Sequence, residues 1–336
     1  MKLNPKTKRH ETIKSNLVSC RFVSFRGLVF SSLEKGRSKS NWQVCLFFVL
    51  FLFSAIVSAQ DDEEIMSVDS SIVVLNATIT DPNGKPVLGL KQNQFRIYED
   101  GIEQKIDFYE AEKTPFAAVI LIDTSGSMEG SVAMARSAAI NFLDGLRADD
   151  VTAIYNFDSK VSLVQDFSNS RDITEKVFDL KAYGYTVLND AIYKAAQELE
   201  KRSEKRRAII VLSDGADTKS ATSADKALKA AIAANATIYT VDMSAINTGG
   251  SGRIQNQGAL KNFAEKTGGI FIPTPGGVAM REAFKNIVEE LGVQYTLGYQ
   301  PSNTAKDGKW RAIELRVARP NLTIRTRKGY NAPKKK

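Results

Sequence analysis

Three oxygen-bearing side chains stand at alternate positions directly after a strongly apolar segment. The segment is 116–122, and Asp123, Ser125 and Ser127 follow it. A short apolar run before a turn predicts a buried β-strand, and a helical pattern begins just after residue 128. Carboxylate and hydroxyl oxygens are hard donors that suit a divalent cation such as Mg²⁺. The spacing therefore indicates a cation site, although a strand–turn–helix link with serine as N-cap would use the same residue types.

Two further segments bring oxygen donors to comparable positions. Thr186 lies in a glycine-containing loop that enters a helical pattern, and Asp214 follows the apolar run 209–212. In an open parallel sheet, ligands bind beyond the carboxyl ends of the strands. Asp123 and Asp214 can therefore converge, although 91 positions separate them in the sequence.

The segments 123–128, 183–190 and 209–217 resemble, in order and spacing, the metal-ion-dependent adhesion site of von Willebrand factor type A (VWA) domains. The resemblance covers residues 113–292. It implies that Mg²⁺ or Mn²⁺ binds Ser125 and Ser127 directly, and Thr186 when the site is engaged. It also implies that Asp123 and Asp214 act mainly through bound waters and hold the serine hydroxyls in place.

The resemblance implies an adhesion function for this site. An ion with few direct carboxylate ligands stays electrophilic, so an Asp or Glu of a partner protein can become its sixth ligand. We therefore expect a metal-dependent protein-binding module and no enzyme. Two alternatives stay open: a structural component of envelope assembly in which the metal is a stabilising clip, and a metal-dependent hydrolase that uses activated water.

The basic charge of the chain is confined to its amino-terminal part. Residues 1–59 hold ten Lys/Arg and two Glu, which equals the net +8 of the whole chain. The remainder carries 36 basic and 36 acidic groups. Because nucleic-acid binding needs a basic footprint, a neutral region argues against that class of partner.

Residues 44–57 form an apolar run that is too short for a membrane-spanning helix, which needs about 20 residues. The run suits the apolar region of a signal peptide, and an A-x-A-like motif ends at Ala59. We expect cleavage between Ala59 and Gln60, and a secreted, periplasmic or cell-envelope location. An uncleaved inner-membrane anchor is the alternative, and only then would a membrane be a partner.

The leader 1–59 also contains both cysteines and the single histidine, Cys20, Cys45 and His10. The region after residue 59 therefore has no thiol and no imidazole. This excludes Ser-His-Asp and Cys-His catalysis there, as well as zinc sites built from His or Cys.

The middle of the chain alternates strand and helix patterns, which predicts an α/β fold with a doubly wound, mainly parallel sheet. The expected strands and helices cover 116–122, 131–146, 151–157, 188–202, 207–213, 223–235, 236–243, 258–267, 269–272 and 278–291. The segments 151–157 and 160–167 are joined by only two residues. They predict a hairpin with an antiparallel edge strand.

Short β patterns flank this region on both sides. Before it they cover 71–80, and then 95–99 and 105–109 around the Asp100-Gly101 turn. After it they cover 293–299, 310–318 and 321–327. Small sheets are marginal alone, so we expect one β-domain with Trp310, Ile313 and Leu315, or their alternates, packed on Val73, Leu75 and Phe95. The expected division is 1–59 leader, 60–112 N-terminal β module, 113–292 VWA domain, and 293–336 C-terminal β segment with a basic tail.

Segments 294–301 and 327–330 resemble a secreted VWA-related subfamily best known from acidobacteria. Near the site, Asp190 fits a helix N-cap or a charge in the first helical turn. Asp217 and Thr218 fit either the edge of the metal site or ordinary loop solvation. Tyr183 and Tyr185 fit a partner surface or core packing. The Gly-, Ser- and Asn-rich stretch 247–256 predicts a loop.

Overall fold

The computed structural model describes residues 72–111, 113–244, 251–273 and 277–335. The predicted signal peptide and its cleavage site lie outside these residues. None of the helices in the described ranges is both long and apolar enough to cross a membrane.

A six-stranded sheet forms the centre of the α/β region, in the order β10-β9-β8-β5-β6-β7. Its strands are β5 (Phe116–Asp123), β6 (Val151–Phe157), β7 (Val161–Ser168), β8 (Arg206–Ser213), β9 (Ala236–Asp242) and β10 (Phe271–Ile272). Neighbouring strands are parallel except β7, which runs antiparallel to β6. The predicted mainly parallel sheet with an antiparallel edge strand is therefore confirmed.

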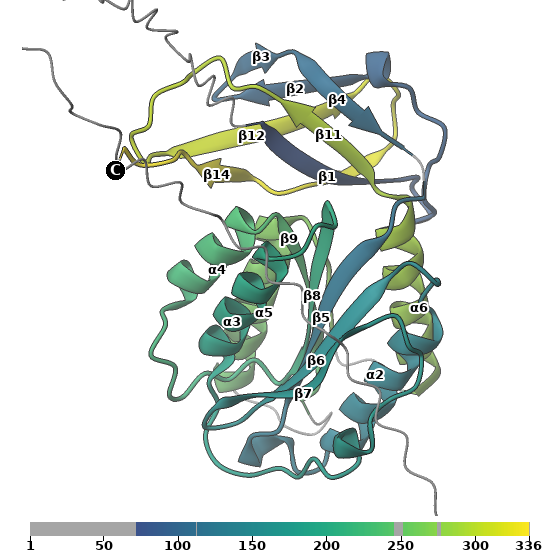
Figure 1. The fold of residues 1–336 in the computed structure, drawn as a ribbon, viewed down its shortest axis with the longest axis vertical. Helices are drawn as coiled ribbons and strands as arrows, with labels where there is room; N and C mark the ends of the chain where they lie inside the picture. The colour runs from purple at the N-terminus through teal and green to yellow at the C-terminus, as the bar shows by residue number, and fades with distance from the viewer. Residues whose placement is uncertain (1–71, 112, 245–250, 274–276, 336) are drawn as a thin grey trace, which may run out of the picture. The chain divides into compact units, whose positions relative to one another are not determined.

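Helices cover both faces of this sheet (Figure 1). They are α2 (Val132–Asp144), α3 (Leu188–Glu200), α4 (Ala224–Ala233), α5 (Ser251–Thr267) and α6 (Gly277–Val293). Ala118 and Ile120 of β5 pack in the core cluster with α2 and α6, whereas Ala117 and Val119 pack in the cluster with α3, α4 and α5. Successive side chains of a strand point to opposite faces, so a continuous apolar run serves both cores. This arrangement confirms the predicted doubly wound fold.

The flanking segments form two four-stranded sheets, β13-β1-β11-β4 and β14-β12-β2-β3. Their strands are β1 (Val73–Thr80), β2 (Phe95–Glu99), β3 (Ile102–Gln104), β4 (Ile106–Glu110), β11 (Tyr295–Tyr299), β12 (Trp310–Val317), β13 (Thr323–Arg325) and β14 (Gly329–Asn331). β1 pairs with β11, and β2 pairs with β12. Strands from both ends of the chain thus build one flanking β-domain, as predicted, while the exact domain boundaries stay a prediction.

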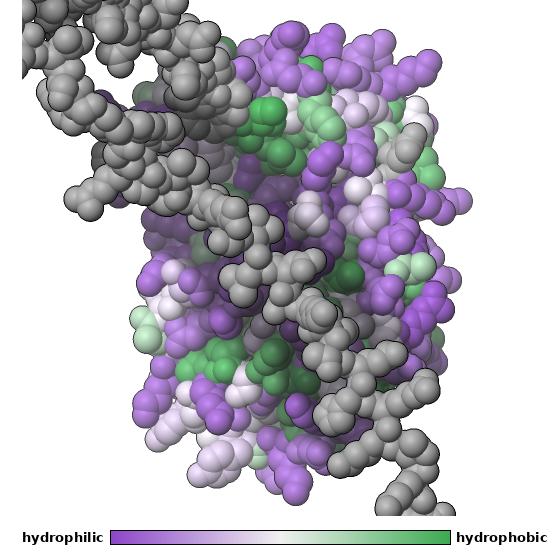
Figure 2. Space-filling view, viewed as in Figure 1, coloured by the Kyte–Doolittle hydropathy of each residue, from purple (hydrophilic) through white to green (hydrophobic). Residues whose placement is uncertain are grey.

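One apolar core fills this β-domain. Val73, Leu75, Phe95, Ile313 and Leu315 all belong to it, as expected. Trp310 does not, because its side chain is 43% exposed. The side chains of β12 alternate with a period of two, so the residue at 310 lies on the face opposite to that of 313 and 315. The visible face of the molecule is largely hydrophilic (Figure 2), as expected when the apolar residues are buried.

Two local predictions were wrong. The hairpin partner of β2 is β3, which follows the turn at Asp100 and Gly101, whereas β4 joins the other sheet. In addition, α5 begins at Ser251, so residues 251–256 are helical and not a loop; residues 245–250 lie outside the described ranges. Gly252 and Gly258 lower the helix propensity of this segment, so the sequence did not indicate that the first turns of α5 are helical.

The β-domain is hydrogen-bonded to the α/β domain by buried polar side chains. Glu290 of α6 accepts hydrogen bonds from Thr78 Oγ1 (3.0 Å) and Tyr239 Oη (2.7 Å), and it forms an ion pair with Arg325. Arg206, at the start of β8, donates from its Nε to Thr296 Oγ1 of β11 (3.3 Å). These contacts leave the carboxyl ends of β5 and β8 free for a site.

Candidate metal centre

The first predicted metal loop begins with a buried carboxylate. Asp123, the last residue of β5, is fully buried. Its Oδ1 accepts a hydrogen bond from the backbone N–H of Ser125 (2.8 Å), and its Oδ2 accepts one from Ser213 Oγ (2.6 Å). Both oxygens are thus fixed by donors from two neighbouring strand ends, and the side chain cannot rotate without loss of these bonds.

The two predicted serine ligands lie together at the mouth of this loop. Ser125 Oγ and Ser127 Oγ are 3.2 Å apart. Ser125 is buried, whereas Ser127 is exposed and belongs to the short helix η2 (Gly126–Met128). The tight turn brings both hydroxyls to one place between the buried carboxylate and solvent.

The second loop lies directly against the first. Tyr183 N–H donates to the carbonyl of Thr124 (2.8 Å), and Gly126 N–H donates to the carbonyl of Gly184 (3.1 Å). Gly184 has φ +78°, and a Cβ there would lie 2.5 Å from Ser159 Oγ. The chain therefore requires glycine at 184 for both conformation and space.

Thr186 joins the second loop to the third. Its backbone N–H donates to Thr218 Oγ1 (2.9 Å), and its carbonyl accepts from the N–H groups of Thr218 and Lys219 (both 3.0 Å). In the third loop, Asp214 Oδ1 accepts from Ala216 N–H (3.0 Å). The fold thus gathers all three predicted segments at one edge of the sheet, while the metal-binding role of the five residues stays a prediction.

Burial raises the pKa of Asp123 to about 6. Hydrogen bonds from Ser125 and Ser213 act in the opposite direction, and the nearby charge of Asp214 raises the pKa further. Desolvation and a second carboxylate both disfavour the ionised form. A cation at this position would relieve both effects.

The donor set fits a hard divalent cation. It offers hydroxyl and carboxylate oxygens, and Asp123 has no Lys or Arg ion-pair partner in the described part of the chain. Among the residues that the structure describes, no group of three or more His, Cys, Asp or Glu could hold a metal. The hydroxyls would therefore supply much of the coordination, and Mg²⁺, which retains waters, suits such a set.

Two acidic residues near the site have a structural task that the sequence did not reveal. Asp190, in the first turn of α3, accepts from the N–H groups of Ala221 (2.9 Å) and Thr222 (2.8 Å). Asp217 Oδ2 accepts from Asn189 N–H (2.8 Å). These carboxylates connect the third loop to α3, so Asp217 does more than solvate its own loop. Desolvation raises the pKa of Asp190, but the hydrogen bonds outweigh this effect and the pKa is lowered.

The two tyrosines beside Gly184 are surface residues. Tyr183 is 80% exposed and Tyr185 is 57% exposed. Core packing, one of the two roles expected for them, is therefore wrong, and their aromatic area is open to solvent next to the first metal loop.

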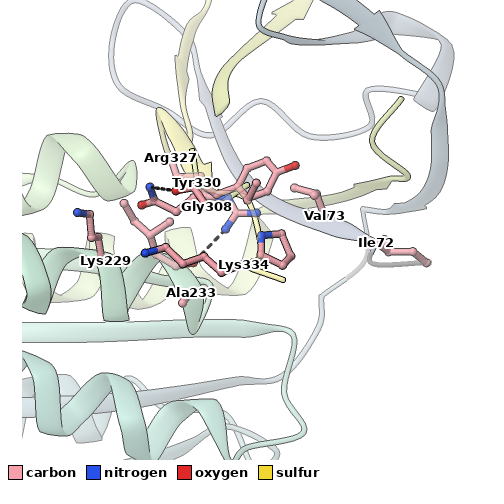
Figure 3. Close-up of a pocket in the computed structure, with 12 residues that line it drawn as sticks. Ile72, Val73, Lys229, Ala233, Gly308, Arg327, Tyr330 and Lys334 are labelled. Atoms are coloured by element: carbon pink, nitrogen blue, oxygen red, sulfur yellow. Dashed lines mark hydrogen bonds between the residues drawn. The ribbon is translucent and has the colours of Figure 1, made fainter. Parts of the chain in front are cut away.

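A cavity of about 560 Å³ lies elsewhere, between α4 and the C-terminal strands (Figure 3). Lys229, Arg327, Tyr330 and Lys334 are among its lining residues. Arg327 donates to the carbonyls of Ile232 (3.0 Å), at the end of α4, and Val74 (2.8 Å). A cation at a helix C-terminus complements the helix dipole, so Arg327 serves the contact between the two domains.

Comparison with known proteins identifies part of the chain. Residues 118–216 match the family model of the von Willebrand factor type A domain. An uncharacterized protein of Synechocystis sp. is 30% identical over 146 residues, a match that covers 42% of this chain and 34% of that protein. The chain thus matches about a third of the length of this relative.

Two solved structures that match this chain also refer to von Willebrand factor domains in their names. A von Willebrand factor type A protein from Catenulispora acidiphila has a TM-score of 0.44 and 14% identity, over 79% of this chain and 75% of that chain. The vWF domain of the type V pili tip protein Mfa5 from Porphyromonas gingivalis has a TM-score of 0.43 and 16% identity, over 55% and 98%.

The predicted acidobacterial-type subfamily is not tested by these matches and stays a prediction. The family match lies within residues 113–292, for which the resemblance was expected, and it spans β5 to the start of the third loop. The chain therefore carries a von Willebrand factor type A domain.

Proposed function

We propose that this chain is a metal-dependent protein-binding module. Ser125, Ser127 and Thr186 would hold Mg²⁺ or Mn²⁺, and Asp123 and Asp214 would support it. When bound, the ion offers a coordination position to an Asp or Glu carboxylate of a partner protein. The observation that carries the proposal is the serine pair, whose hydroxyls lie 3.2 Å apart beside the buried carboxylate of Asp123.

The loop geometry supports binding over structural stabilisation by the metal. Gly126 and Gly184 are joined by a direct hydrogen bond, as are Thr218 and Thr186. Direct protein contacts thus join the loops. We therefore propose that the ion serves a partner ligand rather than the assembly of the loops.

The surroundings also favour binding over hydrolysis. A hydrolase would need a group that accepts a proton from water within hydrogen-bond reach. The single histidine of the chain, His10, lies in the leader. Asp123 is buried, and both of its oxygens already accept hydrogen bonds. We therefore propose that the module makes and breaks no covalent bond.

Calorimetry with Mg²⁺ and Mn²⁺ tests the metal site on residues 60–336. Ser127→Ala should weaken metal uptake without a change in folding, because Ser127 is exposed and its side chain is small. Ser137→Ala, which removes an exposed hydroxyl from α2, is the matched control. Equal metal affinity in Ser127→Ala and wild type would contradict the proposal.

Export is part of the same proposal. A partner outside the cytoplasm requires that the leader direct the chain across a membrane, with cleavage after Ala59. N-terminal sequencing of protein recovered from the medium or periplasm should begin at Gln60. Full-length material found only in the inner membrane would favour the uncleaved anchor.

A further inference from the structure

We infer that Tyr183, Tyr185 and Lys219 form a contact rim beside the metal loops and select the partner. The segment they fit is an acidic protein segment whose metal-binding carboxylate lies between an apolar side chain and a second carboxylate. This inference rests on the proposed function, because it concerns the partner of that same site.

The backbone that carries the two tyrosines is held on several sides. Tyr183 N–H donates to Thr124 in the first loop, and the Gly184 carbonyl accepts from Gly126. Tyr185 N–H donates to Ser159 Oγ (3.1 Å), in the turn between β6 and β7. The backbone therefore has little freedom left to lose when a partner binds, and such pre-organisation favours affinity.

The side chains on this fixed backbone nevertheless point into solvent. Exposures of 80% and 57% are high for tyrosines whose backbone is so well anchored. Nothing in the fold of the described residues uses their aromatic area for a core. Tyrosine supplies a large, rigid contact area at a low entropy cost and is enriched in recognition surfaces. The pair therefore fits an apolar or planar side chain of a partner.

Lys219 adds a positive charge to the same rim. Its ammonium lies 4.4 Å from the centre of the Tyr185 ring, and its backbone N–H donates to Thr186. No carboxylate of the described ranges forms an ion pair with it. The neighbouring Asp217 is occupied, because its oxygens accept from the N–H groups of Asn189 and Ser220. A second carboxylate of the partner would complement this charge.

The rim and the metal loops together require contacts on more than one side of the coordinating carboxylate. Consecutive side chains of a peptide provide such contacts, whereas a small molecule with one carboxylate does not. The chemistry on the rim is aromatic and cationic, so the matching segment is apolar and acidic. These arguments favour a protein segment as the occupant.

Two dye-labelled peptides test the rim in the presence of Mn²⁺. One is acetyl-Gly-Leu-Asp-Glu-Gly-amide and the other is acetyl-Gly-Gly-Asp-Gln-Gly-amide, which keeps only the coordinating carboxylate. Wild-type protein, residues 60–336, should bind the first about tenfold more tightly, a difference that three surface contacts can supply. Fluorescence polarisation measures both affinities.

Two rim variants and one matched control complete the experiment. Tyr183→Ser/Tyr185→Ser and Lys219→Met should each lose part of the wild-type preference for the first peptide, because each removes one kind of contact, aromatic or cationic. The control Ile102→Ser/Lys105→Met removes an exposed apolar side chain and an exposed lysine from the β-domain, and it should behave as wild type. Calorimetry should give unchanged Mn²⁺ uptake in all of them.

The outcomes separate the two proposals. The rim inference would be overturned if the rim variants kept the wild-type preference, or if wild-type protein bound both peptides equally or neither. Normal Mn²⁺ uptake in that case would still support the metal site. Absence of Mn²⁺ uptake by the wild-type protein would instead overturn the proposed function, and the rim inference with it.

Discussion

Ser213 Oγ donates a 2.6 Å hydrogen bond to Asp123 Oδ2 and joins the carboxyl ends of β8 and β5. Both residues are fully buried. The same hydroxyl accepts from Gly215 N–H (3.0 Å), so one serine connects the first metal loop to the third. The position of the candidate ligands therefore depends on a residue that is itself not expected to bind metal.

Ser213→Ala should weaken both folding and metal uptake. The substitution leaves Asp123 Oδ2 without its donor in a buried place, which costs about 1–3 kcal/mol of unfolding free energy. Urea unfolding of residues 60–336 measures this loss, and calorimetry measures metal affinity. Ser137→Ala, on the exposed face of α2, should change neither quantity. Unaltered stability of Ser213→Ala would contradict the buried hydrogen bond.

The pKa of Asp123 predicts an unusual pH dependence of the metal-free protein. This pKa rises from 3.8 to about 6 on folding, chiefly through burial. The folded state then binds more protons than the unfolded state between these values, so unfolding free energy falls as pH rises through that window. A shift of about two units corresponds to a loss on the order of 3 kcal/mol, complete above pH 6.

Urea unfolding in EDTA between pH 4 and 7 measures this dependence. Asp123→Asn removes the titrating group and should flatten the corresponding part of the curve. Addition of Mg²⁺ above pH 6 should recover stability in wild type only, because a ligand that binds the folded state stabilises it. Identical pH profiles for wild type and Asp123→Asn would show that Asp123 ionises without penalty.

Gly184→Ala should disturb the second metal loop. The residue has φ +78°, and the new Cβ would lie 2.5 Å from Ser159 Oγ. We expect a loss of about 1–3 kcal/mol in stability and weaker metal uptake. Gly89→Ala is the matched control, because Gly89 has φ +74° but open space around its Cβ position. If calorimetry finds the same metal affinity in both variants, the contact with Ser159 is unimportant for the site.

The sequence predicts the centre of the fold well, because its signals there are local. The runs 116–122 and 208–212 are continuously apolar, and such runs are typical of parallel strands buried on both faces. The apolar residues of the predicted helices recur with the helical period. The three metal segments follow strands directly, so their convergence needs only the parallel order of those strands.

Other features depend on contacts that no local pattern contains. The bond from Ser213 to Asp123 requires that β8 lie beside β5, which is set by the fold of the whole sheet. Strand β3 has only three residues, two of them exposed, and therefore lacks a clear alternation. Asp190 and Asp217 bind backbone groups across loops, and their sequence surroundings resemble ordinary solvated turns.

A fragment of residues 60–112 should be largely unstructured. Its strands β1 and β2 pair with β11 and β12, which lie about 220 residues further along the chain. Without those partners, Leu75 and Phe95 lose the core that they share with Leu297 and Leu315, and a few short strands do not persist alone. Circular dichroism of this fragment should show a disordered chain with no cooperative thermal transition, whereas residues 60–336 should unfold cooperatively. Cooperative unfolding of 60–112 by itself would mean that the N-terminal module is an independent domain, and that its pairing with the C-terminal strands adds stability without being required for folding.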